Sequence, residues 1–306
     1  MNKVINFHDV RDKNWLEEVL IFLKRKYRII PVSELESFFY KGQDHVNSCH
    51  ITVDDGDKTF YDVIYPLLKK HNLPATLFVS PKICSEQGNF WFQEILNFNE
   101  GEVKKVIAQY FQTDYRLLDK YYILHICKNL KLNQIQDIIN INRSQFGSVV
   151  QGSRNISINQ LLEISRDGLV QIGAHTLNHP ILANEEDWSS RNEIIESFNG
   201  LRDILGYEVK YFAFPNGIPG FDFGEREIDT LKKTGCRLAF STLHKDFGQN
   251  DNPLSIPRYY VSHGNINFIR FKMSFGKYWN TFRSLKVKSE EQARTELRKI
   301  IPREVN

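Results

Sequence analysis

Two pairs of residues in this sequence have the types and the spacing that metal-dependent hydrolysis requires. The first pair, Asp54 and Asp55, directly follows a short apolar run at 49–53 and precedes Gly56. Adjacent carboxylates repel each other, so a bound cation or a proton-transfer network is the usual reason for placing them at the end of a buried strand. An acidic turn is the alternative interpretation, because Asp and Gly are common turn residues.

The second pair, His175 and His179, follows another apolar run at 169–172. Two imidazoles four residues apart can face one metal ion from a helical turn or a tight loop, and imidazole suits zinc and neighbouring transition metals. Such a pair alone is a weak signal, but both pairs come after expected strands. Two imidazoles and one carboxylate would leave positions open for water and substrate, and the second carboxylate could take a proton from that water.

A sheet is needed to bring the two pairs together. Helices with 3.6-residue periodicity alternate with apolar runs that predict strands. These strands are expected at 3–7, 28–30, 49–53, 75–79, 169–172, 209–214, 237–241 and 256–261. About eight strands in this alternation predict a parallel β/α barrel, and the carboxyl ends of its strands form the face where active sites lie.

We expect one barrel domain over residues 1–265 and a basic, aromatic extension over 266–306. A helical interval at 92–166 shows no strand pattern, so it is expected to be an insertion that either covers the site as a lid or only supports the barrel. Aromatic and basic residues alternate at helical spacing in the extension, as in membrane-surface segments. Packing of these aromatic residues on the barrel is the favoured interpretation, because Gly276 weakens a long helix.

The charge, the cysteines and the apolar segments of the chain limit the partners and the cellular location that we expect. The formal net charge is only +3, which gives no reason to expect a nucleic-acid partner. The four cysteines are far apart and form no CxxC pair, so they predict reduced thiols of an intracellular protein. Neither a signal peptide nor a membrane-spanning apolar run is visible. We therefore expect a cytoplasmic location, with contact to the inner face of the membrane through the extension as a further hypothesis.

Five segments resemble the motifs of the polysaccharide deacetylases, the NodB-homology group also called carbohydrate esterase family 4. Residues 52–56, Thr-Val-Asp-Asp-Gly, are similar to their Thr-Phe-Asp-Asp-Gly motif, and residues 173–179 contain their His-Ser/Thr-x-x-His motif. Residues 212–217, Phe-Ala-Phe-Pro-Asn-Gly, resemble the third motif, and residues 253–258 resemble a Leu-Pro-Arg strand. Residues 6–10, Asn-Phe-His-Asp-Val, are similar to the Tyr-His-x-Val opening of one branch.

The resemblance covers residues 4–262 apart from the insertion, and it implies an α/β fold, a distorted (β/α)7–8 barrel of the NodB type. It implies that Asp54 is the general base. It assigns the metal to Asp55, His175 and His179, with Zn²⁺ as the expected ion and other divalent transition metals as alternatives. It places Pro215 and Asn216 beside the substrate, where the backbone N–H of Asn216 would stabilise the oxyanion.

The sequence departs from the family pattern at two catalytic residues, the arginine that orients the base and the histidine that acts as the acid. The third motif often begins with an arginine that orients the base, but Ala213 stands there, so Arg258 is expected to supply this role from another strand. The usual C-terminal Leu-His motif with the catalytic acid has no clear match. His8 fits the branch with the early histidine and is the expected acid. Weaker choices are His244, which follows Leu243, and His263.

We therefore expect a metal-dependent hydrolase that removes N-acetyl groups from an amino sugar of a polysaccharide or glycan precursor. Water activated by the metal and by the Asp base would attack the amide. A deformylase or another amide hydrolase acting on a lipid-linked sugar is an alternative with the same site. A non-catalytic glycan-binding barrel is a second alternative, but binding alone requires no such set of carboxylates and imidazoles.

Overall fold

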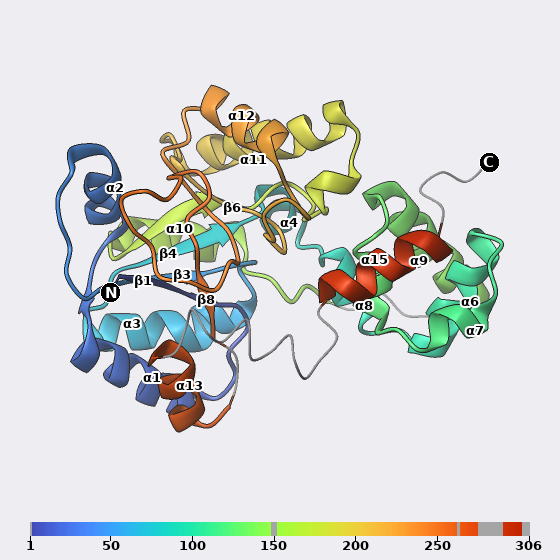
Figure 1. Cartoon of the computed structure of the whole chain (residues 1–306), viewed down its shortest axis with the longest axis horizontal. Helices are drawn as coiled ribbons and strands as arrows, with labels where there is room; N and C mark the ends of the chain where they lie inside the picture. Colours follow the sequence, from blue (N-terminus) through green and yellow to red (C-terminus); the bar gives the residue numbers. More distant parts are fainter. Residues whose placement is uncertain (1, 148–151, 262–263, 275–289, 302–306) are drawn as a thin grey trace.

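A parallel β-sheet surrounded by helices forms the larger part of the molecule (Figure 1). This computed structural model describes residues 2–147, 152–261, 264–274 and 290–301. Within these ranges the sheet has eight strands. They are β1 (Lys3–Phe7), β2 (Arg28–Ile29), β3 (Ser48–Val53), β4 (Ala75–Val79), β5 (Val170–Ala174), β6 (Tyr211–Ala213), β7 (Leu238–Phe240) and β8 (Tyr259–Tyr260).

The strands follow the order β7-β6-β5-β4-β3-β1-β8, and β2 pairs with the start of β3. All pairs between these strands are parallel. A parallel bridge joins Phe240 at the end of β7 to Ile256 shortly before β8, so the two edges of the sheet approach each other. The expected distorted (β/α) barrel is thereby confirmed, and the carboxyl ends of β1, β3, β5 and β6 lie on one face.

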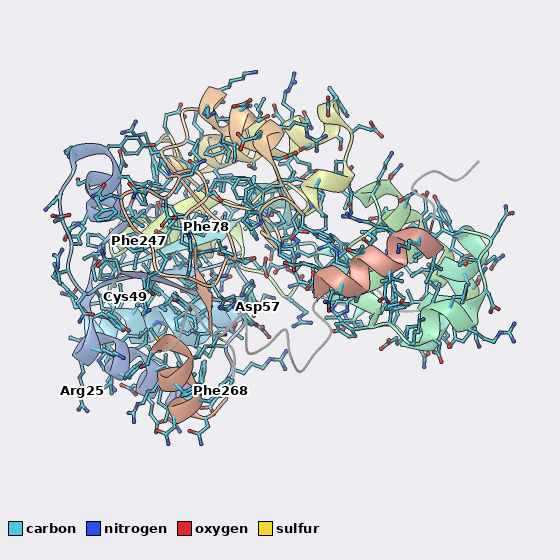
Figure 2. The ribbon with its side chains drawn as sticks, in the orientation of Figure 1. Arg25, Cys49, Asp57, Phe78, Phe247 and Phe268 are labelled. Carbon is cyan, nitrogen blue, oxygen red and sulfur yellow. The ribbon has the colours of Figure 1, made fainter. Side chains whose placement is uncertain are left out.

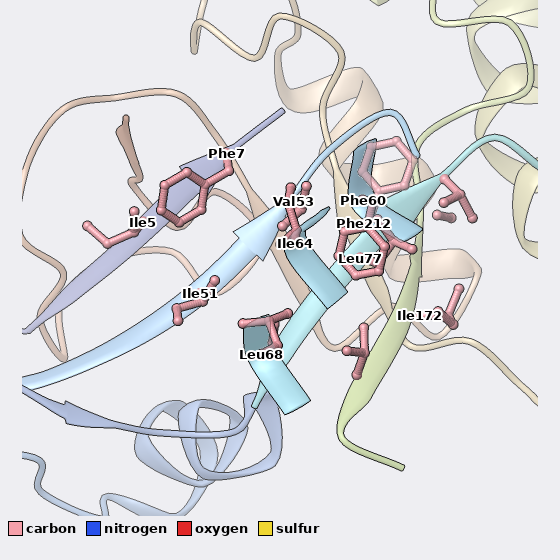
Figure 3. Packing of buried hydrophobic residues seen from close by; sticks show 14 of the residues in the cluster. Ile5, Phe7, Ile51, Val53, Phe60, Ile64, Leu68, Leu77, Ile172 and Phe212 are labelled. Carbon is pink, nitrogen blue, oxygen red and sulfur yellow. The ribbon is translucent and has the colours of Figure 1, made fainter. Parts of the chain in front are cut away.

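The strands at the centre of the barrel are buried on both faces, as parallel strands usually are. Every residue of β1, β3 and β4 is buried. Figure 3 shows how Ile5, Ile51, Leu77 and Ile172 from neighbouring strands pack with side chains of the helix that follows β3, including Ile64. This apolar layer provides the rigid base from which polar residues at the strand ends can project into a site.

Helices cover the outside of the barrel. They are α1 (Lys13–Lys26), α2 (Val32–Lys41), the π-helical segment η1 (Phe60–Ile64), α3 (Tyr65–His71), α4 (Pro81–Glu86), α10 (Ile158–Asp167), the 3₁₀ turn η2 (Leu182–Asn184), α11 (Asp187–Leu205) and α12 (Glu225–Lys233). Helix α1 shows why they form. The side chain of Asp12 accepts a hydrogen bond from the Trp15 N–H, which caps the first turn, and Leu16, Val19 and Leu23 are buried on one face.

A second, helical part lies beside the barrel and has its own apolar core (Figure 1). Its helices are α5 (Trp91–Ile95), α6 (Glu100–Tyr110), α7 (Tyr115–Asp119), α8 (Ile123–Cys127), α9 (Leu132–Phe146) and α15 (Glu290–Ile300). Helix α10, which the expected insertion at 92–166 includes, packs Leu161 and Ile164 into the barrel core instead. The division of the chain at residue 265 stays a prediction, but α15 shares the core of the insertion through Ala293 and Leu297.

The described residues after 264 pack on the protein. Helix α13 (Ile266–Ser274) buries Ile269 and Met273, which pack in the barrel core. Phe268 and Phe271 are half exposed, and Figure 2 shows Phe268 at the outer edge of the molecule. The aromatic and basic positions at 275–289 lie outside the described residues. No described helix combines the length and the apolar character needed to cross a bilayer, and the described residues do not support membrane contact of the extension.

Candidate active site

The side chains of Asp54 and Asp55 point in different directions at the end of β3. The N–H of Asp54 donates to the carbonyl of Phe7, which continues the pairing with β1. Asp55 and Gly56 then adopt the left-handed conformation, with φ of +73° and +72°. A Cβ on Gly56 would lie 2.8 Å from a methyl carbon of Val79, so this turn needs glycine. The sharp turn is what separates the two carboxylates.

Asp55 faces His175 and His179. Its Oδ1 lies 3.4 Å from the Nε2 atoms of both imidazoles. One potential ligand atom from each of the three residues lies within 4.8 Å of the others, and in the part of the chain that the structure describes this is the group with metal-ligand geometry. Asp55 Oδ1 is buried and has no hydrogen-bond partner among the residues that the structure describes, which is a costly arrangement unless a cation is bound there.

The two imidazoles are held in orientations that suit a metal. His175 Nδ1 lies 2.7 Å from the carbonyl oxygen of Ala213, so Nδ1 carries the proton and the lone pair of Nε2 faces Asp55. Burial lowers the pKa of His179 to about 3, which keeps this imidazole neutral at pH 7. Neutral imidazole is the form that ligates a cation. Ala213 therefore takes part in the site through its carbonyl group, although its side chain replaces the expected arginine.

The loop between the histidines is tightly held. Thr176 and His179 have φ of +61° and +59°, and a β-branched residue in this region is an outlier that its surroundings must enforce. The Thr176 hydroxyl accepts the His179 N–H and donates to the His175 carbonyl. The buried carboxylate of Glu193 accepts the backbone N–H groups of Leu177 and Asn178. These bonds fix the distance between the two imidazoles.

Asp54 is surrounded by groups that donate hydrogen bonds to its carboxylate. Arg258, which is fully buried, donates from Nη1 to Asp54 Oδ1 at 2.7 Å and from Nη2 to Oδ2 at 2.8 Å. Asn6 Nδ2 donates to Oδ2 at 2.9 Å, and Arg258 Nε donates to the carbonyl of Ser241. Burial alone would raise the pKa of Asp54, but the positive charge of Arg258 holds it below its ordinary value. Asp54 is therefore an ionised carboxylate at neutral pH.

His8 and His244 both line a cavity of about 970 Å³ that opens over Asp54 and His175. His8 Nε2 lies 3.9 Å from Asp54 Oδ2, and its ring packs edge-on against Tyr260 with centroids 5.1 Å apart. His244 packs edge-on against Tyr259. Of the two, His8 is the one that the structure places against the carboxylate expected to act as base. His263 lies outside the described residues.

Asn216 reaches the cavity from the loop after β6. Its φ is +57°, and its side-chain Nδ2 donates to Asp222 Oδ2 at 2.6 Å and to Glu290 Oε1 at 3.0 Å. Pro215 precedes it and is buried. Apart from His263, the structure thus brings the residues expected in the site to one end of the barrel.

Sequence reasoning missed several residues of the site. Asn6 is polar within a fully buried strand and lies in register with Thr52, a signal that could have pointed to it. Trp91, whose Nε1 donates to the His179 carbonyl, begins helix α5 of the helical part. The residues of α15 that line the cavity carry no motif, and only the three-dimensional structure places them there. They are Glu290, Glu291, Gln292, Thr295 and Glu296.

Comparison with known protein sequences agrees with this geometry. A family model described as polysaccharide deacetylase matches residues 41–239. The chain is 22% identical over 282 residues to a poly-beta-1,6-N-acetyl-D-glucosamine N-deacetylase of Staphylococcus aureus, covering 84% of this chain and 78% of that protein. A poly-beta-1,6-N-acetyl-D-glucosamine N-deacetylase of Staphylococcus epidermidis is 30% identical over 78 residues, which is 26% of this chain and 27% of that protein.

Solved structures share the fold. IcaB from Ammonifex degensii aligns with a TM-score of 0.57 at 18% identity, covering 85% of this chain and 91% of that one. The Streptococcus pyogenes deacetylase PplD in complex with acetate aligns with a TM-score of 0.55 at 15% identity and the same coverage. The family match spans most of the barrel together with the segments that carry the carboxylate pair and the histidine pair, and the chain therefore belongs to the polysaccharide deacetylase family.

Proposed function

We propose that the protein is a metal-dependent N-deacetylase that hydrolyses N-acetyl groups of glucosamine units in a polysaccharide or glycan precursor. The observation that carries this proposal is the division of the carboxylate pair. Asp54 is held by Arg258 and Asn6, and Asp55 directly beside it faces His175 and His179. The Staphylococcus aureus relative, of which the chain spans 78%, is a poly-beta-1,6-N-acetyl-D-glucosamine N-deacetylase, and this supports a glucosamine polymer as the substrate class.

A divalent transition metal fits Asp55, His175 and His179. The three ligand atoms converge, and within the described ranges no group donates a hydrogen bond to Oδ1 of Asp55. Zinc is the expected ion, since a site of two imidazoles and one carboxylate suits it. When bound, the ion would supply a Lewis acid and lower the pKa of a water molecule in the cavity.

The residues of the chain supply the proton transfers and the oxyanion contact. Asp54 accepts the proton of the attacking water, and the bidentate Arg258 keeps its carboxylate oriented and ionised. The N–H of Asn216 donates to the oxygen of the tetrahedral intermediate as negative charge develops on it. His8 gives a proton to the leaving nitrogen, so the products are a carboxylic acid and a free amino sugar.

A panel of substrates determines which acyl group the protein removes. The metal content is measured first, and then acetate and formate released from N-acetyl and N-formyl glucosamine oligomers of different linkage are quantified. Acetate release supports the proposal, and formate release alone would identify a deformylase. Release of neither acid would identify a glycan-binding barrel. The expected cytoplasmic location stays a prediction that cell fractionation tests.

A further inference from the structure

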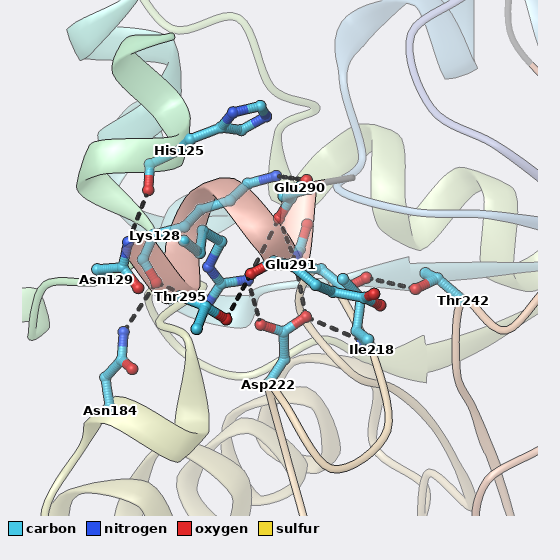
Figure 4. A network of polar contacts seen from close by, with 12 residues as sticks. His125, Lys128, Asn129, Asn184, Ile218, Asp222, Thr242, Glu290, Glu291 and Thr295 are labelled. Carbon is cyan, nitrogen blue, oxygen red and sulfur yellow. Dashed lines mark hydrogen bonds and ion pairs between the residues drawn. The ribbon is translucent and has the colours of Figure 1, made fainter. Parts of the chain in front are cut away.

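Helix α15, near the end of the chain, meets the loop after β6 at the wall of the cavity (Figure 4). Glu290 and Glu291 line the cavity, whereas Ala293 and Leu297 pack into the core of the helical insertion. The helix therefore lies between two parts of the molecule. It is also far outside the region that the family model matches, residues 41–239.

Arg294 is the residue that joins these parts. Its side chain is fully buried, and its Nη1 lies 2.6 Å from Oδ1 of Asp222, which is also buried. The same Nη1 lies 3.2 Å from Glu290 Oε1, and Nη2 donates to the carbonyl of Lys128 at 2.8 Å. Burying an arginine and a carboxylate costs free energy, and in some proteins such a pair specifies one arrangement of its surroundings.

Asp222 and Glu290 are also the two carboxylates that hold the amide of Asn216. The Nδ2 group of Asn216 has two hydrogens, and the two carboxylates accept one bond each, at 2.6 and 3.0 Å. The Thr242 hydroxyl donates to the Asn216 carbonyl at 2.7 Å. Asn216 has a φ of +57°, a left-handed conformation that Asn adopts more readily than most residues other than glycine, and these contacts hold it there.

We propose that Arg294 is a positioning residue of the active site. Its guanidinium balances the negative charges of Asp222 and Glu290, so both carboxylates can approach the same amide and fix the backbone of Asn216. The orientation of the Asn216 N–H toward the reacting oxygen thereby depends on a helix that lies outside the motif segments of the barrel. This inference rests on the proposed function for the role of that N–H, but the positioning itself can be measured without turnover.

The test compares Arg294→Met with Arg298→Met. Arg298 lies one turn further along α15, packs 4.3 Å from the ring of Phe221 and donates to Asn129. Arg298→Met is a matched control because this substitution removes a guanidinium from the same helix. For Arg294→Met we expect kcat to fall on the order of 100-fold, as for a reacting group displaced by about 1 Å, with KM and metal content little changed. Arg298→Met should retain the kcat of the wild type.

A second readout is the side-chain amide signal of Asn216 in a ¹H–¹⁵N NMR spectrum, assigned by its loss in Asn216→Ala. The signal should move in Arg294→Met and stay in place in Arg298→Met. An unmoved signal with unchanged kcat in Arg294→Met overturns the inference, and so do equal losses of kcat in both variants. If the wild type hydrolyses no substrate, the proposed function fails, and the amide signal alone decides on the positioning.

Glu290→Ala covers the case in which Arg294→Met does not fold. The side chain of Glu290 is 22% exposed, so its removal is better tolerated than that of the fully buried Arg294. The variant removes one of the two acceptors of the Asn216 amide and leaves the pair of Arg294 with Asp222 intact. We expect a lower kcat and a shifted amide signal. Unchanged kcat and signal would contradict the inference.

Discussion

Replacing Arg258 with Met is expected to destabilise the protein, because the substitution leaves the carboxylate of Asp54 without its principal partner in the barrel interior. Both side chains are almost fully buried, and two hydrogen bonds of 2.7 and 2.8 Å join them. Met is chosen because the guanidinium carbon lies 5.8 Å from the rings of both Phe78 and Phe240. An unbranched apolar side chain keeps these contacts and removes only the charge and the donors.

The size of the effect follows from the burial of the pair. Removing one partner of a buried ion pair costs about 3–5 kcal/mol, because the other charge stays uncompensated. In proteins somewhat smaller than this one, a loss of 1 kcal/mol lowers Tm by about 2–4 °C. We therefore expect a fall in Tm of roughly 10 °C for Arg258→Met. Asn6 still donates to Asp54 in the variant, which limits the loss.

A double-mutant cycle measures the coupling directly. Thermal unfolding is followed by circular dichroism for Arg258→Met, Asp54→Asn and the double variant at equal metal loading. The double variant should lose clearly less stability than the two single variants together, because it removes both charges. Arg237→Met is the control, since Arg237 pairs with Glu36 at the surface and should cost about 1 kcal/mol or less. Additive losses would show that Arg258 and Asp54 do not stabilise the barrel as a pair.

Three further predictions concern the site. His8→Ala should lower kcat on the order of 100-fold, and His244→Ala should lower it much less; the reverse order in acetate-release assays would reassign the acid. Zn²⁺ at 100 times its Kd should stabilise the wild type by about 2.7 kcal/mol in thermal-shift assays, and His179→Ala should lose this shift; an equal shift would place the metal elsewhere. Glu193→Gln should weaken metal affinity by about 10- to 100-fold in competition titrations, because Glu193 orders the loop between the two histidines. An unchanged affinity would contradict that role.

The barrel could be predicted from the sequence because its strands are short apolar runs that end in polar residues. The strand expected at 49–53 and the observed strand Ser48–Val53 differ by one residue. The last strand was expected at 256–261, yet the ladder covers only Tyr259–Tyr260. Ile256 pairs with β7, and Tyr259 and Tyr260 pair with β1. Pro257, which has no N–H to donate, lies between these two pairings, so the segment does not form one continuous strand.

The residues that could bind a metal were also visible, because their types and spacing are local features of the chain. Contacts between segments that lie far apart in the sequence could not be predicted in this way. Arg294 meets Asp222, 72 residues away, and the carbonyl of Lys128, 166 residues away. Helix α15 has an ordinary amphipathic pattern, and such a pattern does not say which surface its apolar face covers. Arg258 was expected near the base from the substitution at Ala213, and the structure places it there; its effect on catalysis stays a prediction.

The role of Asp54 as the base is tested most directly by comparing the wild type with Asp54→Asn on N-acetylglucosamine oligomers, both loaded with the same amount of Zn²⁺. The Asp54→Asn variant removes the proposed base and leaves Asp55, His175 and His179 unchanged. We expect equal amounts of acetate and new primary amine from the wild type, and a loss of kcat of about 100- to 10,000-fold in the variant with its metal content retained. Full turnover by Asp54→Asn, or acetate release without new amine, would contradict these expectations.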